Sequence, residues 1–164
     1  MTVRDIAAAD GWEWTNPHIV TLVVEPADID AYGHVNNAVY LSWLDRAAWS
    51  HSAALGVPLE RCLTIRRGMA AHRTEIDYLR SALLGQTVWV GTWITATDGR
   101  LRVERRFQIR RPDSDDTLGS TLALDVAPNV AMARTSYVCI NLDTGRAARM
   151  PAELSQAYQV TTGQ

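Results

Sequence analysis

Residues 37–56, NAVYLSWLDRAAWSHSAALG, decide the fold, because they contain the one long helical pattern of the chain. Apolar positions recur there every three or four residues, as expected of a helix that buries one side. They are Tyr40, Trp43, Leu44, Ala47, His51, Ala54 and Leu55. Asn36 is suited to cap the start, since its side-chain oxygen can accept from free backbone N–H groups. Gly56 suits the left-handed closing position and Pro58 prevents continuation, so we predict a helix from Asn37 to Gly56.

Segments rich in β-branched and aromatic residues flank this helix and predict strands. The first is His18–Glu25, which ends at Pro26, where the missing backbone N–H stops ladder pairing. Five more follow the helix, at about 63–78, 86–97, 100–111, 117–127 and 131–141. Asp98-Gly99 is a strong hairpin signal, so the two segments around it should be antiparallel neighbours. A short final helix is predicted at 151–158.

One strand, one long helix and five further strands favour an antiparallel sheet packed around a single helix over alternating βαβ units. The predicted fold class is therefore α+β. A chain of 164 residues is a natural size for one domain, predicted here to span 1–164. Residues 1–17 are expected to form an N-terminal arm, whose Trp12 and Trp14 pack on the body or on a second subunit. Residues 151–164 are expected to form a C-terminal tail.

Composition excludes several classes of function. The net charge of −2 gives no overall attraction to nucleic acid or to an anionic membrane. The N-terminus lacks the apolar region of a secretion signal and no stretch suits a membrane span, so a cytoplasmic location is expected. Cys62 and Cys139 lie in no paired motif and are expected to be free, packed thiols. We expect no metal and no cofactor.

The densest chemical stretch is Asp28–Leu41, DIDAYGHVNNAVYL, which lies just before and within the start of the predicted helix. The unpaired N–H groups of a helix start can stabilise the oxyanion that forms when a carbonyl is attacked. Asp30 would be ionised at neutral pH, and could attack a thioester or deprotonate a water molecule. Gly33 allows a tight turn, and His34 can orient a water or bond the carboxylate. A purely structural alternative remains, in which the carboxylates only satisfy backbone donors of the turn.

The segment DIDAYGHVNNAVYLSWLDRA resembles the active-site segment of hotdog-fold thioesterases, both of the 4-hydroxybenzoyl-CoA thioesterase-like group and of the acyl-ACP thioesterases. In the first group the second Asp of the D-x-D pair is the catalytic carboxylate, which implies Asp30. The amide that polarises the thioester carbonyl lies seven residues later, which implies the N–H of Asn37. In the acyl-ACP group, D-x-N-x-H-V-N-N carries the catalytic residues. Asp30 and His34 match it, and Tyr32 replaces the Asn.

The resemblance extends to HRTEIDYLRSALLGQTVWV and RTSYVCINLDTGRAARMPAEL, so that it covers roughly residues 18–155. It implies a hotdog fold, in which a curved antiparallel sheet wraps around one long central helix. It also implies an acyl-CoA or acyl carrier protein thioester as substrate, and a homodimer or homotetramer with sites at the subunit interface. The expected catalytic residues are Asp30, His34 and Asn37. The expected substrate-binding residues are Gly33, Tyr32, Asn36 and Tyr40.

Other polar residues have structural interpretations. Asp28 is expected to stabilise the turn, and His51 to be a packed histidine bonded to backbone. His72 and Glu75 are kept only as weak candidates for the pocket. Trp43, Trp49, Trp89 and Trp93 suit core or interface packing. Phosphates of CoA could be held by any of several arginines, and the sequence does not choose among Arg66, Arg67, Arg73, Arg80, Arg105, Arg106, Arg110 and Arg111.

Two other functions within the same fold stay open. An enoyl-thioester hydratase or dehydratase would need a D-x-x-x-x-H loop, whereas Asp30 and His34 have three residues between them and Asp28 and His34 have five. A non-catalytic acyl-thioester-binding protein would keep the pocket without needing an ionised carboxylate at Asp30. Serine hydrolases and nucleotide-binding proteins are disfavoured, because no G-x-S-x-G, Walker or dinucleotide-binding motif is present.

Overall fold

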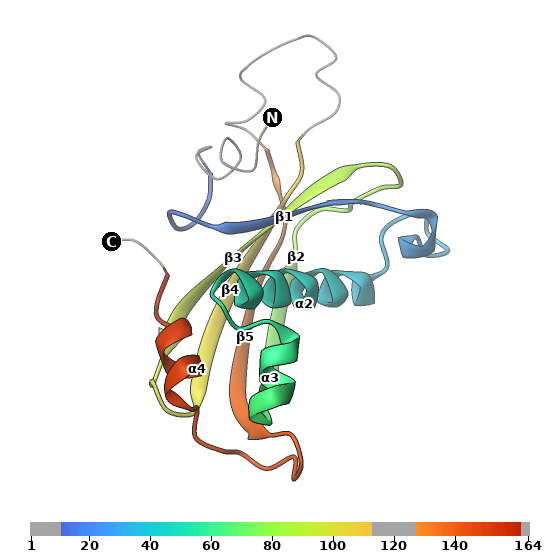
Figure 1. Ribbon diagram of the computed structural model, residues 1–164. Coiled ribbons are helices and arrows are strands. Elements are labelled where there is room, and N and C mark those ends of the chain that lie inside the picture. The colour runs from blue at the N-terminus through green and yellow to red at the C-terminus, as the bar shows by residue number, and fades with distance from the viewer. Residues whose placement is uncertain (1–10, 113–126, 162–164) are drawn as a thin grey trace.

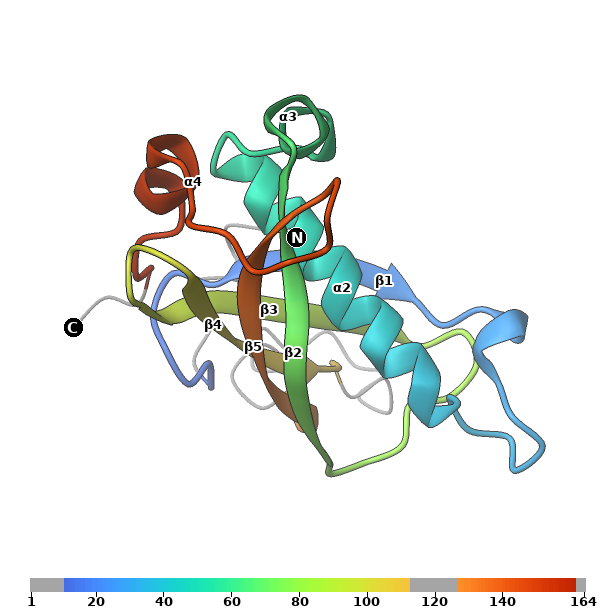
Figure 2. The ribbon, with the colours of Figure 1, turned by 90° about the horizontal axis from the view of Figure 1, so that it is seen from below.

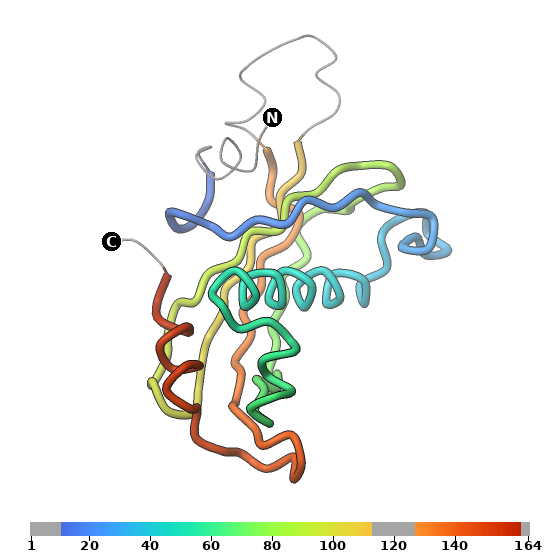
Figure 3. The backbone as a smooth tube through the Cα atoms, in the orientation of Figure 1, coloured from blue at the N-terminus to red at the C-terminus, as the bar shows by residue number. Residues whose placement is uncertain are grey.

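The computed structural model describes residues 11–112 and 127–161 (Figures 1 and 3). Five strands form one antiparallel sheet in the order β1-β3-β4-β5-β2. They are β1 (His18–Val23), β2 (Arg67–Tyr78), β3 (Thr87–Thr97), β4 (Arg102–Arg110) and β5 (Asn129–Asn141). The helical segments are η1 (Pro26–Asp28), α2 (Asn37–Ala54), α3 (Leu59–Ile65) and α4 (Ala152–Ala157). The fold is therefore α+β with a five-stranded antiparallel sheet in the part that the structure describes.

Helix α2 is 18 residues long; it begins at the predicted Asn37 and ends at Ala54, two residues before the predicted Gly56. The side chain of Asn36 accepts from the Ala38 N–H at 2.9 Å, and Gly56 has a φ of 85° just after the helix. The helix lies across one face of the sheet, and α3 and α4 lie near its C-terminal end (Figures 1 and 2). Its apolar side packs on strands β3, β4 and β5 in one core cluster, which includes Tyr40, Trp43, Leu44, Ala47, Val88, Val90, Phe107, Ile109, Val130 and Ala131.

The predicted hairpin is confirmed. Strands β3 and β4 pair antiparallel around Asp98-Gly99. Asp98 Oδ1 accepts from the backbone N–H groups of Arg100, Leu101 and Arg102 at 2.7–2.9 Å. These donors lower the pKa of Asp98 to about 2, because they stabilise its charged form.

The strand predicted at 63–78 is wrong at its start, because α3 runs to Ile65 and Arg66 ends that helix in the left-handed region with a φ of 54°. The β-branched Thr64 and Ile65 favour a strand locally. Burial of Cys62 against the core overrides that preference. The short helix predicted at 151–158 is confirmed as α4. The strand predicted at 117–127 lies, except for Ala127, outside the described residues.

The face of the sheet opposite α2 is covered in part by residues 11–17, so the expected N-terminal arm packs on the body. The rings of Trp12 and Trp14 make edge contacts with Trp93, at centroid distances of 5.8 and 5.5 Å. Trp93 Nε1 donates to the carbonyl of Thr15 at 2.9 Å. A Cβ at Gly91 would lie only 2.5 Å from the Trp12 ring, so only glycine lets the arm approach this closely.

Among the described residues, no helix has the length and apolar character needed to cross a membrane. Cys62 and Cys139 are buried free thiols, as predicted. Of the four tryptophans expected to pack in the core or at an interface, Trp43, Trp89 and Trp93 are buried, whereas Trp49 is 37% exposed.

Candidate active site

The loop before α2 closes on itself. An isolated antiparallel bridge joins Ile29 to Val35, and the Asp30 N–H donates to the His34 carbonyl at 2.8 Å. The Gly33 N–H donates back to the Asp30 carbonyl at 3.0 Å, which requires the positive φ of 79° that Gly33 has. The backbone of this loop is therefore fixed by its own hydrogen bonds, and it presents Asp30 beside the start of the helix.

One oxygen of the Asp30 carboxylate stabilises this turn. Oδ1 accepts from the Tyr32 N–H at 2.8 Å and from the His34 N–H at 3.4 Å. The structural alternative is therefore correct for this oxygen. The second oxygen, Oδ2, has no hydrogen-bond partner within residues 11–112 and 127–161, so it is open to a water molecule or a substrate. The bond expected from His34 comes from its backbone, and its imidazole is exposed.

Asp28 has the turn-stabilising role that its position predicts. Its Oδ2 accepts from the Glu25 N–H at 2.9 Å, which completes the cap of η1. Its carbonyl accepts from the Asn36 N–H at 2.9 Å. Asp28 thus links η1 to the N-cap of α2 and stabilises the loop between them.

A cavity of about 620 Å³ opens between this loop, the start of α2 and the end of β2. It brings together five of the predicted site residues, which are Asp30, Tyr32, His34, Asn37 and Tyr40. Gly33 and Asn36, which were also expected to bind substrate, do not line it. Their observed roles are the turn and the helix cap, respectively.

The start of α2 offers one open donor to this cavity. The N–H of Ala38 is taken by the Asn36 side chain, and that of Val39 by the Asn36 carbonyl at 2.9 Å. The N–H of Asn37 has no acceptor among the residues that the structure describes. On the other side of the residue, the Tyr78 hydroxyl donates to the Asn37 carbonyl at 3.0 Å and fixes this first turn against β2. The helix dipole adds partial positive charge at the same point.

Aromatic residues form the wall of the cavity next to the helix. Tyr40 and Tyr78 meet edge to face, with ring centroids 5.2 Å apart. Tyr40 is buried, and its hydroxyl accepts from the Ala82 N–H at 3.3 Å. Desolvation raises the pKa of Tyr40, so it stays protonated and neutral at physiological pH.

The structure separates the arginines that the sequence left as equal candidates for phosphate binding. Within the described residues, Arg80 is the one that lines the cavity, where it is exposed beside Ser81. Two of the other arginines form ion pairs away from this cavity: Arg66 pairs with Asp143, and Arg73 pairs with Glu75.

The two weak candidates on β2 do not line the cavity. Glu75 pairs with Arg134 and, more weakly, with Arg73, and these pairs lower the pKa of its carboxyl. His72 is exposed at a bulge, where β2 loses register with β5. His51 is buried as expected, but it bonds the side chain of Arg105 at 2.8 Å instead of backbone. His51 and Arg105 thus belong to a buried polar cluster that the sequence did not reveal.

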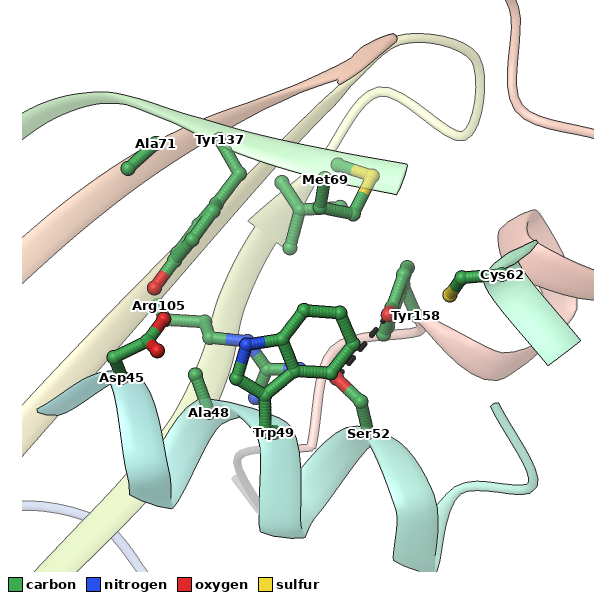
Figure 4. A pocket seen from close by; sticks show the side chains of 11 residues that line it. Asp45, Ala48, Trp49, Ser52, Cys62, Met69, Ala71, Arg105, Tyr137 and Tyr158 are labelled. Atoms are coloured by element: carbon green, nitrogen blue, oxygen red, sulfur yellow. Dashed lines mark hydrogen bonds between the residues drawn. The ribbon is translucent and has the colours of Figure 1, made fainter. Parts of the chain in front are cut away.

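This cluster lines a second, smaller cavity of about 90 Å³ on the side of α2 that faces β2, β4 and β5 (Figure 4). Its polar residues are Asp45, Ser52, Arg105, Tyr137 and Tyr158. One sequence signal could have found it. In β4 the alternate positions Val103, Phe107 and Ile109 are buried, and the period of two puts Arg105 on the same inward face.

Comparison with known proteins agrees with this architecture. Residues 24–158 match the model of the thioesterase-like superfamily, so the chain belongs to that family. A search of the curated proteins found no match.

Many solved structures are similar in fold. The 1,4-dihydroxy-2-naphthoyl-CoA thioesterase Slr0204 from Synechocystis is 22% identical, with a TM-score of 0.71, over 87% of this chain and 96% of that one. SAV2348 from Staphylococcus aureus, solved in complex with CoA, is 16% identical, with a TM-score of 0.73, over 90% and 85%. The gentisyl-coenzyme A thioesterase BH1999 is 16% identical, with a TM-score of 0.68, over 85% and 98%. At these identities the likeness establishes the shared hotdog fold.

Proposed function

We propose that this protein hydrolyses acyl thioesters to a free acid and a thiol, with Asp30 as its catalytic carboxylate. One observation carries the proposal. A carboxylate with an open oxygen and a helix N-terminus with an open N–H line the same cavity. Hydrolysis needs a group to attack or activate water and a donor to hold the oxyanion, and these two groups supply both. Membership of the thioesterase-like superfamily supports the assignment.

The reaction follows from these positions. Asp30 Oδ2 takes a proton from water, the hydroxide oxygen bonds to the thioester carbon, and the carbonyl oxygen gains negative charge. The Asn37 N–H and the dipole of α2 stabilise that charge. The intermediate then collapses, the carbon–sulfur bond breaks, and the departing thiolate takes the proton from Asp30, which restores the carboxylate. Direct attack by Asp30 to form an anhydride, which water then hydrolyses, would use the same groups.

Substitution of Asp30 by Asn tests this role sharply. Asn at position 30 keeps an oxygen that can accept from the Tyr32 N–H, so the turn is preserved while the charge is lost. We expect D30N to reduce kcat by roughly 10² to 10⁴ in a thiol-release assay across acyl-CoA chain lengths, with an unchanged melting temperature. D28N is the matched control, because Asp28 caps η1 and does not line the cavity. Full activity of D30N would reject the assignment.

Acyl-CoA is the thioester that we propose as substrate, with Arg80 as a phosphate contact at the mouth of the cavity. Arg80 is exposed and makes no ion pair with a carboxylate among the described residues. The CoA bound to SAV2348 supports this choice over a carrier protein. R80A should raise KM for acyl-CoA several-fold and leave kcat almost unchanged, since a remote phosphate contact contributes uniform binding. An equal effect on a thioester of a short thiol without phosphates would contradict it.

We also propose that the whole chain acts as one hotdog domain whose sheet wraps around α2, and that it works as a homodimer. Strand β2 is 12 residues long and pairs on one side only, with β5, within the described residues. A long open edge of this kind invites pairing with a second chain. Light scattering should therefore show a dimer at micromolar concentration. A fully active monomer would exclude this assembly.

A non-catalytic acyl-thioester-binding protein is the second candidate function. It is favoured by the bonds from Oδ1 of Asp30 to its own loop, because a turn-forming Asp needs no catalytic role. Such a protein would bind acyl-CoA without releasing thiol. The same assay separates the two functions when it is combined with a direct measurement of acyl-CoA affinity.

A further inference from the structure

The small cavity in Figure 4 is separate from the Asp30 site. It shares no lining residue with the larger cavity. It lies along the second half of α2, where Asp45, Ala48, Trp49 and Ser52 face it. Ser52 is 15 positions after Asn37, which corresponds to roughly 22 Å along the helix axis.

Arg105 is a buried cation in the lining of this cavity, with only 3% of its surface exposed. Its Nη1 bonds His51 Nδ1 at 2.8 Å, and its Nη2 donates to Ser52 Oγ at 3.0 Å. Its Cζ lies 5.5 Å from the centroid of the Tyr158 ring. A guanidinium has donors only, so His51 Nδ1 must accept and the imidazole must be neutral. Every one of these contacts is therefore with an uncharged group.

The neutrality of His51 has a clear electrostatic cause. Burial, the charge of Arg105 and the neighbouring His18 lower the pKa of His51 to about 3. The rings of His18 and His51 stack with centroids 4.9 Å apart, and His18 Nε2 bonds Ser50 Oγ at 2.9 Å. Burial and Arg105 lower the pKa of His18 as well. His18 and His51 are therefore neutral near pH 7. They add no positive charge to the cluster, and they supply no negative charge to balance Arg105.

A buried guanidinium without a counter-ion is costly, because Arg remains charged even when it is buried. No ion pair between described residues includes Arg105. The hydroxyl of Ser52 accepts from both Arg105 and Tyr158, which leaves its own hydrogen as a donor. Arg105 and Ser52 thus give the lining of this cavity one positive charge and hydrogen-bond donors, and Asp45 adds one negative charge.

We propose that this cavity binds a small carboxylate group, with Arg105 as the anchor and Ser52 as a second donor. A cavity of about 90 Å³ is small, which suits a carboxylate with a short carbon stem. Ala48, Met69 and Val103 supply apolar contacts for that stem. A bound carboxylate supplies the counter-charge that Arg105 lacks.

Asp45 is the charged group that opposes such a ligand. It lines the same cavity, is exposed, and burial of part of its carboxyl raises the pKa of Asp45. Its negative charge repels a second carboxylate, so the wild-type affinity is lowered by Asp45. Removal of this charge should tighten binding, which a purely structural role of Arg105 would not predict.

The test is a titration of the full chain with sodium propionate, followed by NMR shifts of backbone and tryptophan indole N–H signals. Propionamide, a neutral molecule of the same shape, and sodium chloride are the ligand controls. We expect saturable propionate binding, and propionamide binding at least about tenfold weaker, since a charged contact is worth more than 1.4 kcal/mol when desolvated. Equal binding of the two molecules, or no propionate binding, would overturn the proposal.

Substitutions distinguish the proposed role of Arg105 from that of its neighbours. R105M should abolish propionate binding, whereas R102M, an exposed arginine of the same strand, should keep it. D45N changes an exposed side chain and should bind propionate about fivefold more tightly than the wild type does. Unchanged or weaker binding by D45N would contradict the proposal even if R105M fails to fold. D30N should bind propionate like the wild type, so this result does not depend on the proposed hydrolysis.

Discussion

The two oxygens of Asp30 show what a sequence motif can and cannot specify. The spacing of Asp, Gly and His before a helix predicts a tight turn, and the turn is present. The turn interpretation is confirmed for Oδ1, which bonds the loop. The catalytic interpretation stays a prediction, which Asp30 fits because it lines the cavity. The role of His34 depends on which of its atoms reaches the carboxylate, and residue spacing cannot decide that.

The buried His51 should make the stability of the protein depend on pH. Its pKa is about 3 in the folded protein against 6.5 for an exposed histidine, so below pH 6.5 the unfolded chain binds a proton that the folded chain does not. The free energy of unfolding should therefore fall as the pH drops from 6.5 towards 3, with a limiting slope of about 1.4 kcal/mol per pH unit. Urea unfolding of the wild type and of H51Q across this range measures the difference.

The lowered pKa of His18 acts in the same direction, so the single variant should flatten the profile without removing the whole slope. The carboxylates that titrate in this range are the same in both proteins, so their effect cancels in the difference between the two unfolding free energies. Parallel stability profiles for the two proteins would show that His51 is not held neutral by the fold.

At the level of elements, prediction succeeded where a local signal and tertiary burial agree. Helix α2 has a cap, a closing glycine and an apolar side, and its bounds agree with the predicted ones to within two residues. Helix α3 was missed because Thr64 and Ile65 favour a strand, whereas the contact that decides is the burial of Cys62. The sheet order places β2 beside β5, and no local pattern contains that long-range pairing.

The cap of α2 should be worth a measurable part of the stability. N36A removes the acceptor for the Ala38 N–H and should lower the free energy of unfolding by about 1 kcal/mol. N36D keeps an acceptor and adds a negative charge at the positive end of the helix dipole, so it should be at least as stable as the wild type. Chemical denaturation of the three proteins checks the order. Equal stability of N36A and wild type would mean that water replaces the cap without loss.

For the whole molecule, the sheet has two different faces. One packs against α2, and the other carries residues 11–17 through Trp12, Trp14 and Trp93. The sequence suggested that the arm packs somewhere, but only the structure shows that Gly91 makes room for it. The buried Arg105 was also hidden, because a list of arginines does not reveal which of them face inward.

The close contact between Gly91 and the Trp12 ring can be tested by substitution. G91A places a Cβ 2.5 Å from the Trp12 ring, so the ring must move away from Trp93. We expect a loss of about 1–3 kcal/mol in unfolding free energy. The indole fluorescence should also become redder, since Trp12 gains contact with water. The double variant G91A/W12A should lose no further stability beyond W12A alone, because the clash is absent there. Additive losses would refute the contact.

Helix α2 borders both cavities, the larger one through Asn37 and the smaller one through Ser52. An α-helix behaves as a stiff rod, because every turn is tied to the next by backbone hydrogen bonds. A molecule that tilts the rod at one end therefore displaces the groups at the other end as well. Occupancy of the smaller cavity would in this way shift the Asn37 N–H, the proposed oxyanion donor, without any contact between the two bound molecules.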